Sequence, residues 1–237
     1  LVSLFCPVTK KFYIRTTDGK LKIIVFNPLN DDEYAFPVSG DWSGNGIDGV
    51  GIYYPKKGLA LLKNTLDNSN RVDVSINYTV EGGYIPLAGN WEGKGVDSLC
   101  FYFPEKSIFY FPEKGGEVKE VRMGEVASSY IPISGDWNNS GSDSIGLYDP
   151  SNSLFVLKYT REASRADQIF RFGPSDGQSK FIPISGSWIG VSDSIGLYEK
   201  DTGVFRLKNV AKENGNADHI FKINFKNLIP LSIMSFE

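Results

Sequence analysis

Histidine, the residue most often used for acid–base catalysis, occurs only once among the 237 residues, as His219. One histidine excludes sites that bind a metal ion through several histidines, and we expect no histidine-based catalytic triad. Cys6 and Cys100 fall at unrelated positions of the repeat described below, so we expect two buried free thiols. The remaining candidates for chemistry are the aspartates that recur at one spacing: Asp48, Asp97, Asp143 and Asp193.

These aspartates belong to a repeated segment, which is most complete as IPISGDWNNSGSDSIGLYDP from Ile131 to Pro150. Further copies begin at Phe36, Ile85 and Ile182, and a fifth copy is divided between the two ends of the chain. The repeat contains four short β-type runs separated by turn residues, and no helical period is sustained. Four strands in a repeat of about 45 to 50 residues are typical of a β-propeller blade. The recurring proline sets the interval, at Pro37, Pro86, Pro132, Pro183 and Pro230.

We therefore predict an all-β fold: a five-bladed β-propeller of four-stranded antiparallel blades, in a single domain over residues 1–237. The two ends of the chain are complementary, because the N-terminal segment supplies three strands of a blade and the C-terminal segment supplies the first. Joining them in one blade closes the ring and leaves no open sheet edge at the seam. The predicted blades are 36–83, 84–129, 130–180 and 181–228, with a closing blade formed by 1–33 and 229–237.

A tryptophan follows the first strand of each complete blade at a constant offset, and an aspartate precedes each second strand. The tryptophan is large enough to fill the space between neighbouring blades, although a ring of ligand-stacking aromatics is an alternative. The aspartate is interpreted as a carboxylate that locks a turn by accepting backbone N–H bonds. Besides the four aspartates, these structural positions are Trp42, Trp91, Trp137 and Trp188.

The consensus P-x-x-G-D-W-x-G-x-G-x-D-[ST]-I-G-L-Y-D-P, followed by F-x-L and A-D-x-I-F-x-F-G-P, resembles the FG-GAP and VCBS-like repeats of prokaryotic cell-surface and secreted proteins. The resemblance covers nearly the entire chain. It implies a propeller of four-stranded blades, extracellular placement, and a role in adhesion, in surface display or as an accessory domain beside an enzyme. The third copy carries the consensus best, at Pro132, Gly135, Asp136, Trp137, Asp143, Ser144, Ile145, Gly146, Tyr148, Pro150, Ala166, Asp167, Phe170, Phe172 and Gly173.

In many such repeats the loop after the first strand, D-x-[DN]-x-D-G, binds calcium, because this cation needs about six to eight oxygen ligands. The present loops depart from that pattern. The first copy keeps one carboxylate among Asp41, Ser43 and Asn45, which form the candidate Ca²⁺ site. The second copy places Lys94 at a ligand position, and the fourth loop is shorter. We expect no other cofactor.

Enzymatic activity has little support in the sequence. Glycosidases on five-bladed propellers are an alternative class, and they need two carboxylates that converge on the reacting bond. The strands predicted to line the central channel carry no acidic residue, and only Asp41 and Asp136 lie just beyond them. We therefore expect that the chain is not an enzyme.

Composition excludes two further classes. The formal net charge is −3, from 25 Lys and Arg against 28 Asp and Glu, and the basic residues form no runs. We therefore expect no nucleic-acid partner, and no apolar run approaches the roughly 18 residues of a membrane span. Since the chain begins with Leu1 instead of methionine, we expect a processed or excised segment.

The predicted function is a non-catalytic extracellular module for surface display, adhesion or scaffolding, with a protein or glycan partner at the cell surface. The alternative is a lectin-like propeller that binds carbohydrate through recurrent tyrosines. Asn77 and Asn138 begin N-x-S/T sequons that could accept glycans in a secreted protein. The recurrent tyrosines are Tyr53, Tyr102, Tyr148 and Tyr198.

Overall fold

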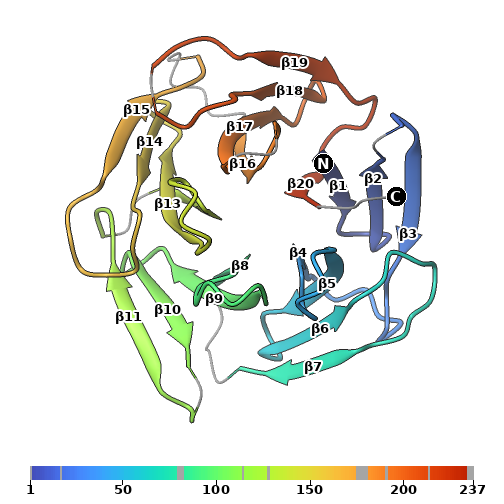
Figure 1. Ribbon diagram of the computed structural model, residues 1–237. Coiled ribbons are helices and arrows are strands. Elements are labelled where there is room, and N and C mark those ends of the chain that lie inside the picture. The colour runs from blue at the N-terminus through green and yellow to red at the C-terminus, as the bar shows by residue number, and fades with distance from the viewer. Residues whose placement is uncertain are drawn as a thin grey trace.

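The computed structural model describes residues 2–16, 18–78, 83–113, 115–126, 129–174, 181–189, 192–212 and 214–233. Within these residues, twenty strands form five sheets of four antiparallel strands. The sheets stand around a central axis like the blades of a propeller (Figure 1). The predicted all-β, five-bladed architecture is confirmed. No helix of the described chain is long and apolar enough to cross a membrane.

Each blade runs from an innermost strand beside the axis to an outermost strand at the rim (Figure 1). Blade 1 is β4 (Phe36–Gly40), β5 (Gly49–Tyr54), β6 (Leu59–Lys63) and β7 (Val74–Asn77). Blade 2 is β8 (Ile85–Gly89), β9 (Ser98–Phe103), β10 (Ile108–Pro112) and β11 (Val118–Arg122). Blade 3 is β12 (Ile131–Gly135), β13 (Ser144–Asp149), β14 (Leu154–Leu157) and β15 (Gln168–Arg171). Blade 4 is β16 (Phe181–Gly186), β17 (Ser194–Glu199), β18 (Val204–Leu207) and β19 (His219–Lys222).

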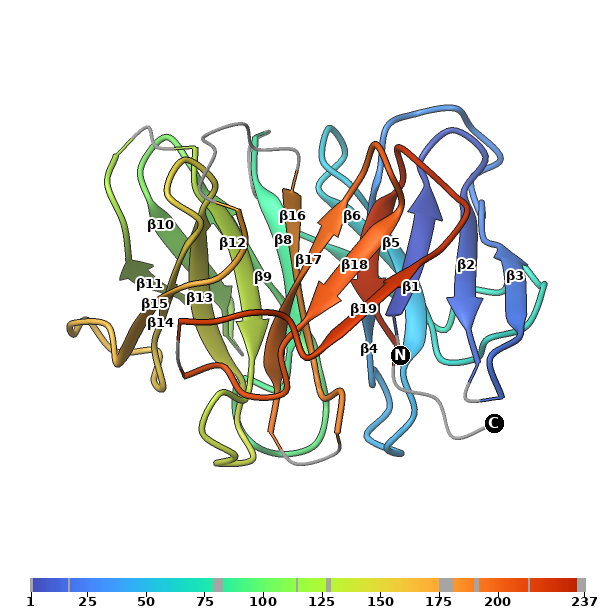
Figure 2. The same cartoon turned by 90° about the horizontal axis from the view of Figure 1, so that it is seen from above.

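Blade 5 closes the ring with strands from both ends of the chain, as predicted. It contains β20 (Ile229–Ser232), β1 (Val2–Cys6), β2 (Lys11–Arg15) and β3 (Leu21–Val25). The pairing of β20 with β1 is antiparallel, and its register places Val2 opposite Ser232 and Phe5 opposite Ile229. Figure 1 shows β20 beside β1, and Figure 2 shows β1, β2 and β3 side by side in the same blade. The closing blade therefore ties the N-terminal strand to the C-terminal strand through backbone hydrogen bonds.

The innermost strands tolerate the recurring proline because each has a paired neighbour on one side only. Pro132 of β12, for example, lies opposite Leu147 of β13, while the other edge of β12 faces the axis. The glycine in the second strand is required for a different reason, which is the space taken by a neighbouring side chain. A Cβ atom on Gly196 would lie 2.4 Å from Leu207 Cδ2, so the leucine of the third strand occupies that space.

The hydrophobic core lies between the blades. Five clusters of buried side chains each join residues of two neighbouring sheets, such as Ile133 and Phe155 of blade 3 with Ile195 and Leu197 of blade 4. Burial of these apolar faces stabilises each blade against the next, so the blades depend on one another. Of the two cysteines, Cys100 is buried as expected, whereas Cys6 is only half-buried, and both are free thiols.

Candidate ligand-binding site between blades 4 and 5

The recurring aspartates connect neighbouring blades. The Oδ2 atom of Asp97 accepts the backbone N–H of Asp41 at 2.8 Å. Asp143 accepts the N–H of Asn90 at 2.6 Å in the same way, and Asp193 accepts that of Asp136 at 2.9 Å. Each bond runs from one blade to the preceding blade, whereas the sequence indicated a carboxylate that locks its own turn. Asp48 occupies the same repeat position in blade 1.

Burial is the largest cause of the raised pKa values of Asp97, Asp143 and Asp193. It raises the pKa of Asp97 and of Asp143 to about 7, and nearby carboxylates add to the rise while the accepted N–H bond opposes it. Burial also raises the pKa of Asp193. The carboxylates of Asp97, Asp143 and Asp193 thus each accept a backbone N–H from the preceding blade. These aspartates therefore form inter-blade contacts that hold the ring together.

The candidate calcium loop is held by its own backbone. Asp41 Oδ1 accepts the N–H groups of Ser43, Gly44 and Asn45 at 3.2, 2.7 and 3.1 Å, and Oδ2 accepts that of Gly46 at 2.6 Å. A calcium ion needs those oxygens to face the metal, so this arrangement does not fit the ion. The described residues contain no group of three or more His, Cys, Asp or Glu that could hold a metal ion.

Three of the four recurring tryptophans are buried between blades. Trp42, Trp91 and Trp137 expose 7%, 5% and 3% of their surface and pack in clusters that span their own and the next blade. Trp188 differs, because it is only half-buried and lines a cavity. The recurrent tyrosines proposed for carbohydrate binding are not available to a ligand, since each is at most 1% exposed.

The two sequon asparagines lie on exposed strand and loop positions. Asn77 ends β7 and is exposed, but Thr79 of its sequon falls outside the described residues. Asn138 is exposed in the loop after β12, where Ser140 of the same sequon donates its hydroxyl to Asp136 Oδ1 at 3.3 Å. Glycosylation at both positions stays a prediction.

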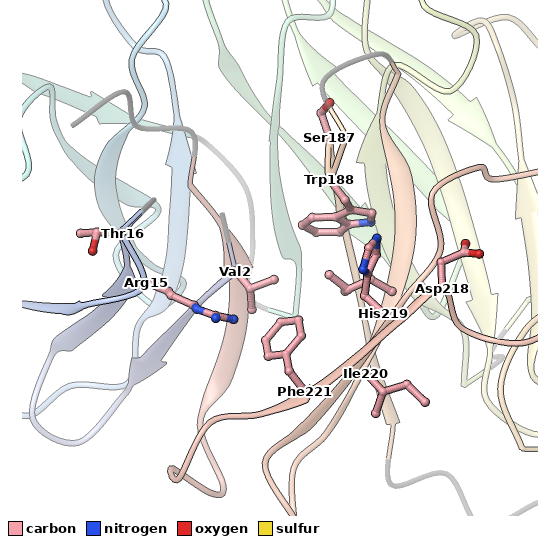
Figure 3. Close-up of a pocket in the computed structure, with 11 residues that line it drawn as sticks. Val2, Arg15, Thr16, Ser187, Trp188, Asp218, His219, Ile220 and Phe221 are labelled. Carbon is pink, nitrogen blue, oxygen red and sulfur yellow. The ribbon is translucent and has the colours of Figure 1, made fainter.

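A cavity of about 610 Å³ lies between blades 4 and 5. Figure 3 shows Val2 and Arg15 of blade 5 on one side, and Trp188 and His219 of blade 4 on the other. Among the described residues, the lining is Val2, Arg15, Thr16, Gly19, Ser187, Trp188, Leu207, Asp218, His219, Ile220 and Phe221.

The connection between the third and fourth strands is short in two blades, over residues 113–117 of blade 2 and 16–20 of blade 5, and the cavity lies beside the one in blade 5. In blades 1, 3 and 4 the residues between the third and fourth strands, 64–73, 158–167 and 208–218, form long loops that reach the preceding blade. Asn68 Oδ1 of the blade 1 loop accepts the N–H of Val25 in β3 at 2.9 Å. The blade 4 loop likewise bonds blade 3 through Asn214, which accepts the N–H of Arg171 at 2.6 Å.

Blade 5 has a tight hairpin at this place. Thr16 donates its N–H to Lys20 O at 2.9 Å, and Gly19, with a φ of 81°, donates to Thr16 O at 2.9 Å. Asp18 Oδ1 accepts the Thr16 hydroxyl at 2.5 Å, so the turn is bonded to itself. The hairpin therefore does not cover the junction with blade 4, and the space beside Trp188 stays open.

The short hairpin also changes the surroundings of a recurring cation. At the end of the third strand, blades 1, 3 and 4 carry Lys63, Lys158 and Lys208. Lys63 Nζ is fully buried and donates to Asp67 Oδ1 at 2.7 Å and to Ser69 O at 2.8 Å, both in its own loop. Lys158 Nζ donates to the loop carbonyl of Ser164 at 3.0 Å.

Arg15 occupies the equivalent position in blade 5, where the hairpin supplies no such loop carbonyls. Its guanidinium carbon lies 4.9 Å from the centroid of the Phe221 ring, a cation–π contact across the cavity. No carboxylate of the described residues forms an ion pair with Arg15. The cavity therefore holds an exposed cation beside an aromatic ring.

Two further polar groups line the blade 4 side. Asp218 Oδ2 accepts the N–H of Asn209 at 2.8 Å, a bond that Asp73 and Asp167 repeat in blades 1 and 3, so its main role is structural. His219 Nε2 lies 2.8 Å from Asn209 Oδ1. When Nε2 donates to Asn209 Oδ1, Nδ1 is left as a hydrogen-bond acceptor.

The sequence analysis did not identify this site. It treated Trp188 as equivalent to the other tryptophans, and it assigned no role to Arg15 or His219. The signal was present in the spacing, because Asp18-Gly19 closes a hairpin where blades 1, 3 and 4 carry long loops. Comparing loop lengths between repeats would have narrowed the candidates to the junctions beside the short hairpins of blades 2 and 5.

No protein-family sequence model matches this chain, and no curated protein sequence matches it. Among solved structures, the chain is similar to selenomethionine-substituted virginiamycin B lyase from Staphylococcus aureus, with 13% identity and a TM-score of 0.47. That alignment covers 93% of this chain and 65% of the lyase chain. A streptogramin B lyase structure is similar with 9% identity, a TM-score of 0.48, and coverage of 92% of this chain and 62% of the lyase. This chain thus spans less than two thirds of either lyase chain.

These comparisons correct the predicted function. We expected a non-catalytic extracellular module and no enzyme, but the similar solved structures are named as lyases. The prediction of a non-catalytic module is therefore wrong, and the propeller architecture gives no reason to exclude catalysis. At 13% and 9% identity, the likeness assigns no reaction to this chain. The comparisons also do not show the FG-GAP or VCBS-like family.

Proposed function

We propose that the chain binds a small organic ligand in the cavity between blades 4 and 5. The observation that carries the proposal is the uncovered junction, where the blade 5 hairpin leaves Trp188 half-buried and Arg15 without loop partners. Ligand sites are commonly concave, largely apolar, about 300–1,000 Å³ in volume, and provided with a few polar groups. The cavity of about 610 Å³ has these properties.

The lining combines the two kinds of group that a small ligand needs. Val2, Leu207 and Phe221 supply apolar surface, and the Trp188 ring supplies a flat face on which a ring can stack. Arg15 and His219 supply polar atoms that can orient the ligand. A binding site built on rigid strands of two blades requires little ordering when the ligand enters, which favours affinity.

A substitution that fills the cavity tests the proposal, and the repeat offers a matched control. His219 points toward Trp188 in the cavity (Figure 3), and Gln168 occupies the equivalent position of blade 3, opposite Leu157 as His219 is opposite Leu207. His219 is exposed and Gln168 is half-buried, so tryptophan at either position should cost little stability. We expect the aromatic probe 2-naphthamide to bind the native chain and Gln168→Trp, and to bind His219→Trp much more weakly.

Titration calorimetry measures the binding directly. Thermal unfolding gives a second readout, because a ligand at 100 times its Kd stabilises the folded state by about 2.7 kcal/mol. Equal binding to both tryptophan variants would place the probe elsewhere on the molecule and contradict the proposal. Absence of binding by both 2-naphthamide and its acid, 2-naphthoate, would contradict it as well.

A further inference from the structure

We infer that the ligand carries an anionic group next to a flat apolar body, and that Arg15 binds the anion. This inference rests on the proposed function, since it specifies the chemistry of the ligand in the same cavity. It starts from the repeat position of Arg15. In blades 1 and 3 the same position carries a lysine, and the ammonium group of that lysine donates its hydrogen bonds to oxygens of the loop that follows it.

The comparison with Lys63 shows what is different at Arg15. Lys63 Nζ has three oxygen partners in the loop that follows it: Asp67 O, Asp67 Oδ1 and Ser69 O. The hairpin after Arg15 folds back on itself instead, with Lys20 paired to Asp18 at 2.6 Å. The donors of the Arg15 guanidinium consequently face the cavity, with Phe221 as their neighbour 4.9 Å away.

The other charged group among the described residues of the lining is Asp218, a carboxylate of the opposite sign. Its Oδ2 atom already accepts the N–H of Asn209 at 2.8 Å, so this oxygen is engaged by the backbone. A cationic ligand could stack on Trp188, but Arg15 would repel it. An anion is attracted by Arg15, and the planar guanidinium can donate two parallel hydrogen bonds to a carboxylate, sulfate or phosphate.

The apolar part of the ligand follows from the remaining side chains. Trp188 and Phe221 both lie in the cavity, and Phe221 already contacts the Arg15 guanidinium. A ring that stacks on Trp188 would fill the space between the two blades while its anionic substituent points to Arg15. The expected class is therefore an aromatic or other flat carboxylate, sulfate or phosphate.

A pair of isosteric probes separates the charge from the ring. We would measure the Kd of 2-naphthoate and of neutral 2-naphthamide by titration calorimetry at low ionic strength, for the native chain and for Arg15→Met. The native chain should bind the carboxylate about tenfold more tightly than the amide, as one charge-assisted hydrogen-bonded pair provides. Arg15→Met should lose this preference and bind both probes with the affinity of the amide.

Two further variants serve as controls. Lys222→Met removes an exposed cation from the same strand as Phe221, outside the cavity lining, and should keep the tenfold preference. Arg15→Lys keeps the positive charge but lacks the planar guanidinium, so this variant should keep part of the preference for the carboxylate.

The possible failures are distinguishable. If the native chain binds both probes equally well, or if Arg15→Met keeps the preference for the carboxylate, the inference is overturned while the proposed function stands. If neither probe binds the native chain, the proposed function fails together with the inference.

Discussion

At the scale of single residues, one recurring side chain has a role that depends on its neighbouring blade. Asp143 follows a glycine-bearing turn and accepts a hydrogen bond, as the sequence indicated, but the donor is Asn90 of blade 2. The backbone N–H of Asp143 in turn donates to Asn90 O at 3.0 Å. These two reciprocal bonds hold the turn of one blade against that of the next.

The raised pKa of Asp143 makes the stability of the ring depend on pH. Because its folded-state pKa of about 7 exceeds the ordinary value of 3.8, the folded state favours the neutral acid. That stabilisation is complete below about pH 4 and is lost as the pH rises through about 7, at about 1.4 kcal/mol per unit of pKa difference. Asp143→Asn keeps an uncharged acceptor for the Asn90 N–H. As the pH rises from about 4 to about 7, the free energy of unfolding of this variant should therefore fall less than that of the native chain.

Urea unfolding of the native chain and of Asp143→Asn at a series of pH values measures the difference. Asp32→Asn, at an exposed position, is the control and should follow the native profile. Parallel profiles for all three proteins would show that Asp143 is ionised at little cost.

At the scale of elements, the connection between the third and fourth strands differs among the blades in its length and in the contacts that it makes. The long loops of blades 1, 3 and 4 place carbonyl groups around a lysine and side-chain amides on the preceding blade. The described residues of the blade 5 hairpin place no carbonyl groups around Arg15 and no side-chain amide on blade 4. The same repeat thus has loops that bond to the preceding blade at some junctions and a cavity at the junction of blades 4 and 5.

The same repeat position should therefore respond differently to substitution in two blades. Lys63→Met leaves the carbonyls of Asp67 and Ser69 without their buried donor, at a cost of about 1–3 kcal/mol. Arg15→Met removes an exposed cation whose contact is the Phe221 ring, and should cost less than about 1 kcal/mol. Chemical denaturation of both variants measures the free energies, and equal losses would contradict the distinction between a loop-bonded lysine and a cavity-lining arginine.

At the scale of the whole molecule, the ring depends on one pairing between the two ends of the chain. Leu231 and Ile233 are buried in the cluster that joins blade 5 to blade 1. Their strand, β20, also supplies the innermost position of blade 5. Removing it would expose the inner edge of β1 and part of that core.

Deletion of residues 229–237 should destabilise the entire propeller, because the blades share their cores with their neighbours. We expect a lower melting temperature and a broader transition in calorimetry and circular dichroism. Deletion of 234–237 alone, which keeps β20, is the matched control and should have a smaller effect. An unchanged melting temperature for the longer deletion would show that closure contributes little.

The position of the protein in the cell and its macromolecular partners stay predictions from the sequence. Extracellular placement and a protein or glycan partner rest on the resemblance to surface-protein repeats, which the comparisons do not show. The cavity between blades 4 and 5 is the independent basis for the proposed ligand binding.

The sequence alone determined the architecture. The regular return of proline, glycine, tryptophan and aspartate fixes the repeat length, and alternating apolar runs identify four strands in each repeat. The complementary ends identify the closing blade, because a strand left unpaired at either end would expose a sheet edge. These features are local or periodic, so they can be read without knowledge of which residues meet in space.

Only the tertiary structure decided which members of the repeat differ in function. Trp137 and Trp188 occupy the same position of the repeat, yet one is buried and the other lines a cavity. Asp143 meets its donor from another blade, and Arg15 faces open space that the hairpin fails to cover. Sequence periodicity describes what the blades share, whereas the cavity lies where strands from the two ends of the chain meet, which only the folded ring brings together.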